Sequence, residues 1–228
     1  MSHLGVKFSI LSILISAAVA FGKEPAHHDQ VMIGLRAGHN AVLGNFSALS
    51  LQTQQSFHDK FLLDAGIQYN TIGKIALEAC PSYDIRFDWG GILPEAMIAY
   101  TNFSSINSLS IGAGAKAYFG WVSAKAGYYY HLYGSDGSMI SEPFNIYYEF
   151  CVDFLHKVRN WALELIFTNC EKFELDRHYQ PSFIAQCQYN IGQSLSLALG
   201  FGYKPSGMFN ISADYYQSFI KTGLCYRW

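Results

Sequence analysis

Most of this chain alternates between apolar and polar side chains, one residue at a time. In the segment 108–119, Leu109, Ile111 and Phe119 fall on one side of the alternation, and Ser110 and Lys116 fall on the other. Because successive side chains of a strand point to opposite faces, this pattern predicts a strand with one apolar and one polar face. Twelve such segments follow one another, with turn residues between them: 31–40, 45–55, 60–70, 75–89, 92–103, 108–119, 122–133, 144–155, 161–167, 183–191, 195–203 and 218–228.

The length of these segments indicates what they span. A tilted strand needs about ten residues to cross a bilayer, and most of the segments are near that length. The pattern predicts an all-β fold, a transmembrane antiparallel up-and-down β-barrel of about 12 strands formed by residues 31–228. Barrels of 8 or 10 strands are the alternatives. Pro81 lies inside the longest segment, where a proline predicts a bend or a bulge.

Composition agrees with a membrane barrel. Half of the residues are hydrophobic and only 14% are charged, whereas a soluble domain has about a quarter of its residues charged. Beyond residue 20 no apolar run is long enough for a membrane helix. A closed barrel is the other architecture that satisfies every backbone group in lipid. The net charge of −2 argues against nucleic acid as a partner.

The first residues predict export. Lys7 supplies a positive charge, an apolar run follows, and Ala18-Val19-Ala20 has the small residues of a cleavage site. We therefore expect a signal peptide at 1–20 and a polar periplasmic leader at 21–30.

Aromatic residues sort to the two ends of the predicted strands. If both termini are periplasmic, all four tryptophans lie at the periplasmic level: Trp89, Trp121, Trp161 and Trp228. The opposite rim collects tyrosines, among them Tyr69, Tyr100, Tyr130, Tyr148 and Tyr203. Membrane barrels carry such girdles at both interfaces, whereas a soluble β-sandwich would bury its aromatics on one inner face.

The last segment, SFIKTGLCYRW, places Ile220, Thr222, Leu224, Tyr226 and Trp228 at alternate positions. It resembles the terminal strand of bacterial outer-membrane β-barrels, which acts as their assembly signal. Together with the alternation, the signal and the girdles, it makes the chain similar to the small-barrel porin classes, including the OmpW-like group and the narrow twelve-stranded sugar-acid porins. The resemblance implies a bacterial outer-membrane location. The implied partners are outer-membrane lipid, small solutes and, through the C-terminal strand, the barrel-assembly machinery.

Neither porin class matches in every respect. OmpW-like proteins are expected to have eight longer strands, and the segments number twelve. Sugar-acid porins are expected to have a basic lining, and the polar face here carries both signs.

The charged residues of the polar face decide the predicted function. We expect these to line the lumen: Arg36, Glu78, Asp84, Lys116, Lys125, Glu149, Asp153 and Glu164. Such a lining predicts a narrow channel for passive passage of small polar or amphipathic solutes. The alternative is that the charges pair with one another and fill the interior, which gives a plugged structural or surface-contact barrel without transport.

Other chemistry finds less support in the sequence. Some outer-membrane barrels hydrolyse lipids, and His131 has Ser135 and Glu149 as possible company, but the spacing matches no known barrel hydrolase, so we expect no enzyme. The five cysteines fit neither a zinc site nor a CxxC pair, and their odd number leaves at least one unpaired. We expect them to serve as small apolar side chains, and whether one pair forms a disulfide is left open. We expect no metal and no cofactor. The longest outer loops, 134–142, 170–181 and 204–217, are the candidates for surface contacts.

Overall fold

The computed structural model describes residues 29–40, 44–57, 60–103, 106–135, 138–154, 160–175, 181–205 and 217–228. The predicted signal peptide and nearly all of the predicted leader lie outside these ranges. No helix among the described residues is long and apolar enough to cross a membrane. The strands are β1 (Gln30–Asn40), β2 (Gly44–Phe57), β3 (Phe61–Asn70), β4 (Lys74–Tyr83), β5 (Ile85–Phe87), β6 (Gly90–Phe103), β7 (Ile106–Phe119), β8 (Val122–Ser135), β9 (Ser138–Asp153), β10 (Trp161–Thr168), β11 (Cys170–Glu171), β12 (Glu174–Leu175), β13 (Ser182–Asn190), β14 (Leu195–Lys204) and β15 (Gln217–Arg227).

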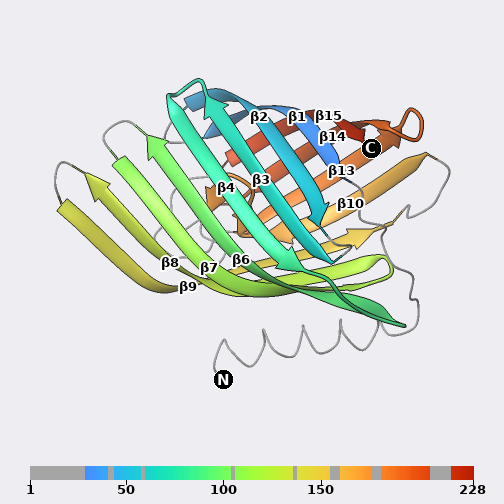
Figure 1. Ribbon diagram of the computed structural model, residues 1–228. Coiled ribbons are helices and arrows are strands. Elements are labelled where there is room, and N and C mark those ends of the chain that lie inside the picture. The colour runs from blue at the N-terminus through green and yellow to red at the C-terminus, as the bar shows by residue number, and fades with distance from the viewer. Residues whose placement is uncertain are drawn as a thin grey trace.

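The strands close into one barrel (Figure 1). Each strand pairs antiparallel with its neighbours in the chain, and β15 pairs with β1 over the whole length of β1. Because β4 and β5 are successive pieces of one crossing strand, and both pair with β6, the barrel has twelve strands. β11 and β12 form a separate two-stranded sheet. The predicted fold class and strand number are therefore confirmed.

Two segments differ from the predicted strands. The segment 75–89 is broken at Asp84, and the ladder between β4 and β6 omits Cys80 and Pro81, since a proline has no N–H to donate. β9 begins at Ser138, six residues earlier than expected, and its pairing with β8 shifts register beside Phe144. Phe144 has a φ of 62°, as a residue in a β-bulge can have.

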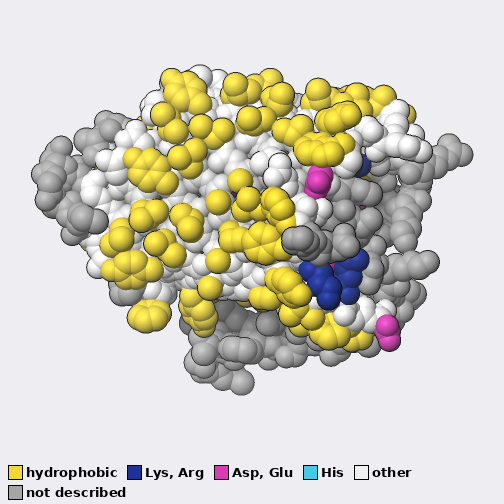
Figure 2. All heavy atoms as spheres, viewed as in Figure 1, with side chains coloured by type: hydrophobic (Ala, Val, Ile, Leu, Met, Phe, Trp, Pro, Cys, Tyr) yellow, Lys and Arg dark blue, Asp and Glu magenta, His cyan; other side chains and the backbone are white. Residues whose placement is uncertain are grey.

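The outer wall of the barrel is apolar. Ile111 in the middle of β7 is 50% exposed, and Leu199 and Phe201 on β14 are exposed as well. Hydrophobic side chains dominate the face in Figure 2, and its Lys, Arg, Asp and Glu side chains gather in a few places. Every strand of the barrel wall has exposed apolar side chains. Such side chains are costly in water, whereas lipid is a favourable surrounding for them.

On the inner wall, large aromatic rings lie flat against glycines. Tyr147 is fully buried and covers Gly114 and Gly127, where a Cβ would overlap the tyrosine ring or its hydroxyl. Phe219 covers Gly202 in the same way. A glycine lets another group approach the backbone closely, so these rings pack against the wall and extend little into the lumen.

Candidate functional site in the barrel lumen

A short hairpin crosses the lumen of the barrel. It comprises β11, the turn Lys172-Phe173 and β12, and we call residues 170–175 the lumen hairpin. The hairpin leaves the wall directly after β10, and its turn contacts β2, β3 and β4. β3 and β10 are six strands apart in either direction around the twelve-strand ring, so the hairpin reaches the opposite wall. The sequence predicts an outer surface loop at residues 170–181. For residues 170–175 that prediction is wrong, and residues 176–180 lie outside the described part.

The backbone of the turn is held by two side chains of β4. The Phe173 N–H donates to Glu78 Oε2 at 2.8 Å, and Lys74 Nζ donates to the Phe173 carbonyl at 3.1 Å. The buried Phe173 ring packs over Gly66 of β3, where a Cβ would lie 2.6 Å from it. Phe173 has a φ of 66°, which is an outlier for a bulky residue. Such a conformation persists where the surroundings determine it, and here β3 and β4 do so.

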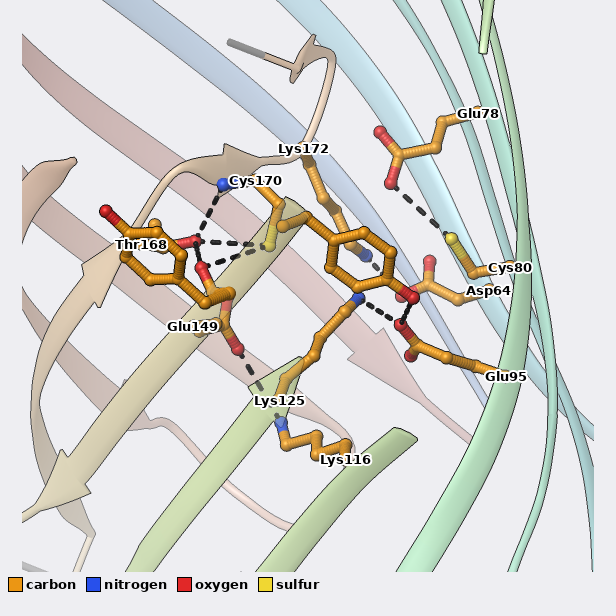
Figure 3. Close-up of polar contacts among 12 residues, drawn as sticks. Asp64, Glu78, Cys80, Glu95, Lys116, Lys125, Glu149, Thr168, Cys170 and Lys172 are labelled. Carbon is orange, nitrogen blue, oxygen red and sulfur yellow. Dashed lines mark hydrogen bonds and ion pairs between the residues drawn. The ribbon is translucent and has the colours of Figure 1, made fainter. Parts of the chain in front are cut away.

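Ion pairs fix the rest of the hairpin. Lys172 Nζ forms an ion pair with Asp64 of β3 and donates to Gln52 Oε1 of β2 at 3.3 Å. Figure 3 shows Lys172 extended toward Asp64. In β11, the Glu171 carboxylate pairs with Arg36 of β1, with Arg36 Nη2 3.3 Å from Glu171 Oε2.

The buried Arg36 is itself positioned by an aromatic ring. Its guanidinium lies 3.7 Å from the centroid of the Phe219 ring, which is a cation–π distance. Because Phe219 in turn lies on Gly202, the wall of β14 and β15 supports the arginine that pairs with Glu171. Predicted lumen residues Arg36 and Glu78 therefore both contact the hairpin.

At its base the hairpin is anchored to β9 by hydrogen bonds between neutral groups. The Asn169 amide donates to the Ile146 carbonyl at 2.9 Å, and its Oδ1 accepts from the Tyr148 N–H at 2.7 Å. The Thr168 hydroxyl donates to the Tyr148 carbonyl at 3.0 Å. The Asn169 side chain thus makes hydrogen bonds to β9 that the backbone of a longer β10 would make. The main chain can therefore leave the sheet here and turn into the lumen.

A second group of charges lies on the wall formed by β6 to β9. Lys125 Nζ lies 2.8 Å from Glu95 Oε1, and the Tyr147 hydroxyl donates to the same oxygen at 3.0 Å. Lys116 and Glu149 form a looser pair at 3.9 Å (Figure 3).

Glu95 and Tyr147 are not among the lumen residues predicted from the sequence. A signal for Glu95 was present, because outward Ile98 and Tyr100 place residues 95, 97 and 99 on the inner face. The irregular start of that segment concealed the pattern.

The remaining predicted lumen residues lie toward the end of the barrel at which β1 begins and β15 ends. Asp84 is almost completely buried between β4 and β5, where it accepts a hydrogen bond from the Tyr118 hydroxyl at 2.8 Å and pairs with Arg86 at 2.6 Å. Asp153 and Glu164 are register partners on β9 and β10. Glu164 accepts a hydrogen bond from Gln186 at 3.4 Å. The inner wall therefore carries charges of both signs at this end too.

Most of the aromatic residues predicted for the girdles lie at or near strand ends, but Tyr130 and Tyr148 lie further inside, because β8 and β9 extend beyond the predicted segments. Trp89 stacks between Phe87 and Phe119, with ring centroids 4.9 Å from each, and Trp161 packs against Tyr189 at 4.6 Å. Tyr148 is half-buried, with its ring 5.7 Å from that of Phe167. The other girdle residues are exposed: Tyr69, Trp121, Tyr100, Tyr130, Tyr203 and Trp228.

The histidine considered for hydrolysis has a serine partner that the sequence did not suggest. His131 Nδ1 lies 2.7 Å from Ser110 Oγ, and the two residues are register partners on β8 and β7. Both are buried, so neither is open to a lipid substrate. The side chain of Ser135 is outside the described part.

The thiols and the metal-ligating side chains can be located among the described residues. All five cysteines are free, so the disulfide that the sequence left open is not formed. Within the same residues, no three His, Cys, Asp or Glu side chains are grouped so that they could hold a metal ion.

Comparison with known proteins gives structural matches alone. No family model matches the chain, and no curated protein does. The solved structure titled "KdgM porin in complex with disordered oligogalacturonate" has a TM-score of 0.55 and 14% identity, covering 86% of this chain and 99% of its own. The NanC porin has a TM-score of 0.57 and 12% identity, covering 86% of this chain and all of its own.

Barrels with other roles match to a similar degree. The translocator domain of the autotransporter NalP from Neisseria meningitidis has a TM-score of 0.56 and 11% identity, covering 99% of this chain and 96% of its own. The outer membrane phospholipase A from Escherichia coli has a TM-score of 0.50 and 10% identity, covering 93% and 96%. The chain therefore has the fold of the small outer-membrane porins, as the sequence predicted, but a fold shared by a porin, a translocator and a phospholipase does not assign a function.

Proposed function

We propose that this protein is a bacterial outer-membrane barrel that forms a narrow channel for passive passage of small polar or amphipathic solutes. The observation that carries the proposal is a closed twelve-stranded barrel with an apolar outer wall and a charged inner wall. About eight strands leave an interior filled by side chains, whereas more strands leave room for water. The aromatic rings that lie flat on glycines add to that room.

The lining favours polar solutes without strong selection by charge. Lys125 pairs with Glu95, Lys116 with Glu149 and Lys172 with Asp64. A paired wall presents alternating donors and acceptors to a solute, and the opposite charges of each pair reduce the net field in the lumen. The lumen hairpin makes this channel narrower than the barrel itself.

We further propose that β15 is the strand through which the assembly machinery receives the barrel. The support is its position, because β15 closes the ring by pairing with β1, and its alternate apolar residues end with the pair Tyr226 and Trp228, whose rings lie 6.2 Å apart. Replacing both aromatics by serine should reduce the folded fraction in the outer membrane, and an unchanged fraction would refute this role.

A barrel without transport is the second candidate, and the lumen hairpin is the observation in its favour. In that case the hairpin is a permanent plug, and the protein has a structural or surface-contact role. Catalysis is the least supported candidate, because the Ser110–His131 pair is buried in the described structure.

The deciding experiment is single-channel recording of the refolded protein in planar bilayers. Discrete, salt-dependent openings would support the channel. A matched variant should be recorded beside it, with residues 170–175 replaced by a glycine–serine linker of equal length. If neither protein conducts although both fold, the channel proposal is refuted; if only the variant conducts, the hairpin is the closed gate or plug of a real pore.

A further inference from the structure

We propose that the lumen hairpin is a gate held shut by a charge latch, which opens when its turn leaves β2, β3 and β4 while its base stays on β9. We define the latch as the contacts of Lys172 and Phe173 with Asp64, Lys74 and Glu78, together with the Arg36–Glu171 pair. This inference rests on the proposed channel function.

The hairpin does not hold its position by its own structure. Its ladder has two residue pairs, Cys170 with Leu175 and Glu171 with Glu174, and an isolated hairpin is at best marginally stable even when it is longer. Its place across the lumen is therefore set by what the turn contacts.

The backbone of the turn favours release. Phe173 has a φ of 66°, a conformation that is strained for an aromatic residue and lasts only while its surroundings impose it. The imposing groups are the Glu78 carboxylate on its N–H and the Lys74 ammonium on its carbonyl. Once these contacts break, Phe173 can return to an ordinary backbone conformation. The docked and released states of the hairpin therefore differ in the backbone conformation of Phe173.

The two ends of the hairpin depend on different interactions. The base is held by neutral hydrogen bonds of Thr168 and Asn169 to the backbone of β9. The turn is held by the charged side chains of Asp64, Lys74 and Glu78 and by the packing of the Phe173 ring on Gly66. Arg36 holds Glu171 of β11 in a buried pair. The Lys172–Asp64 pair is partly exposed, with 43% and 31% of the two side chains accessible. Salt screens exposed charges and leaves neutral hydrogen bonds nearly unaffected. Rising ionic strength should therefore release the turn before the base.

The test compares open fractions in single-channel records at low and high salt. Glu78→Gln removes the charge that accepts from the Phe173 N–H and should raise the ratio of open to closed time about tenfold. Asp64→Asn should raise it about threefold, because that pair is more exposed. Asp88→Asn is the matched control, since it makes the same change of charge in the exposed turn between β5 and β6. It should leave the ratio as in the wild type.

A charge exchange tests the pair directly. Asp64→Lys places two cations together and should hold the gate open, and adding Lys172→Asp should restore the closed fraction. If the double variant behaves like Asp64→Lys alone, the ion pair does not latch the hairpin.

A second readout does not depend on conduction. In a chain with Cys151, Cys170, Cys187 and Cys225 replaced by alanine, the buried Cys80 of β4 lies beside Glu78, with its Sγ 3.6 Å from Glu78 Oε1, and its labelling by a charged maleimide reports whether the turn has left β4. Labelling should speed up with salt and in Glu78→Gln, at constant pH. If labelling responds while no variant conducts, the channel proposal fails and the latch stands. If openings occur but neither readout changes with salt or with the variants, the channel stands and the latch is refuted.

Discussion

At the scale of single residues, the orientation of side chains on β7 has a measurable consequence. Ile111 is half exposed in the middle of the strand, with Ile98 and Tyr130 beside it on β6 and β8. If this face meets lipid, Ile111→Arg places a charge near the bilayer midplane, where it costs about 2–4 kcal/mol. The free energy of unfolding of the refolded protein in lipid vesicles, from urea titration, measures the loss.

The same strand supplies the control. Ile106 is exposed to a similar degree but stands at the first position of β7. Near an interface an arginine costs about 0–1 kcal/mol, so Ile106→Arg should be nearly neutral. Equal losses for the two variants would mean that depth in a bilayer does not set the cost, which would contradict a lipid-facing β7.

At the scale of elements, β14 and β15 support the lumen hairpin through one aromatic ring. A Cβ at Gly202 would overlap the ring of Phe219, and the Arg36 guanidinium that pairs with Glu171 stacks on the same ring, 3.7 Å from its centroid. Gly202→Ala should therefore push Phe219 from the wall and cost about 1–3 kcal/mol of unfolding free energy, as overpacking does. Urea titration in vesicles measures this cost too.

Two further variants separate overpacking from a general effect of losing a glycine. A Cβ at Gly192, in the turn between β13 and β14, would have no atom within 4 Å, so Gly192→Ala should be neutral within about 0.5 kcal/mol. Combining Gly202→Ala with Phe219→Leu should recover part of the loss, because the smaller side chain leaves room for the methyl group. A loss that persists in full would mean that the ring is not the cause.

At the scale of the whole molecule, the barrel could be predicted from the sequence and its contents could not. Alternation such as that of 108–119 is local, so it predicts each strand and its outward face without knowledge of any other strand. The lumen hairpin has no such signal. Its residues reach Arg36, Asp64 and Glu78 over separations of 135, 108 and 95 residues, and a charged, aperiodic segment reads as a surface loop when its partners are that distant.

The sequence predicts which charged side chains face the lumen, but it does not predict which of them form ion pairs with one another. The alternation placed Lys125 and Glu149 on the inner face, and they are indeed register partners on β8 and β9. Yet Lys125 pairs with Glu95 of β6, two strands away across the inner wall. Which charges meet inside a barrel depends on its curvature and on side-chain length, and neither can be read from a one-dimensional pattern.

The contacts at which the barrel closes also predict that the stability of the folded protein depends on pH. Asp29 lies at the seam: its carbonyl accepts from the Trp228 N–H, and its carboxylate accepts from the N–H and the hydroxyl of Ser56 at 2.6 and 2.8 Å. The Ser56 N–H, and then its hydroxyl, hold the pKa of the Asp29 carboxyl below its ordinary value.

A carboxyl whose pKa is lower in the folded state stabilises that state above its unfolded pKa of about 3.9, and the contribution is lost as the pH falls through the lower folded value. Asp29→Asn should therefore destabilise the barrel near neutral pH, and its difference from the wild type should shrink as the wild-type carboxyl becomes protonated in acid. Ser56→Ala should show a smaller loss with the same pH dependence, since it removes the hydroxyl and keeps the N–H. Urea titrations in vesicles across this pH range would measure the free energy of unfolding of both variants. If the difference between Asp29→Asn and the wild type stayed constant into acid, the charge of Asp29 would not stabilise the contacts between β1, β2 and the end of β15.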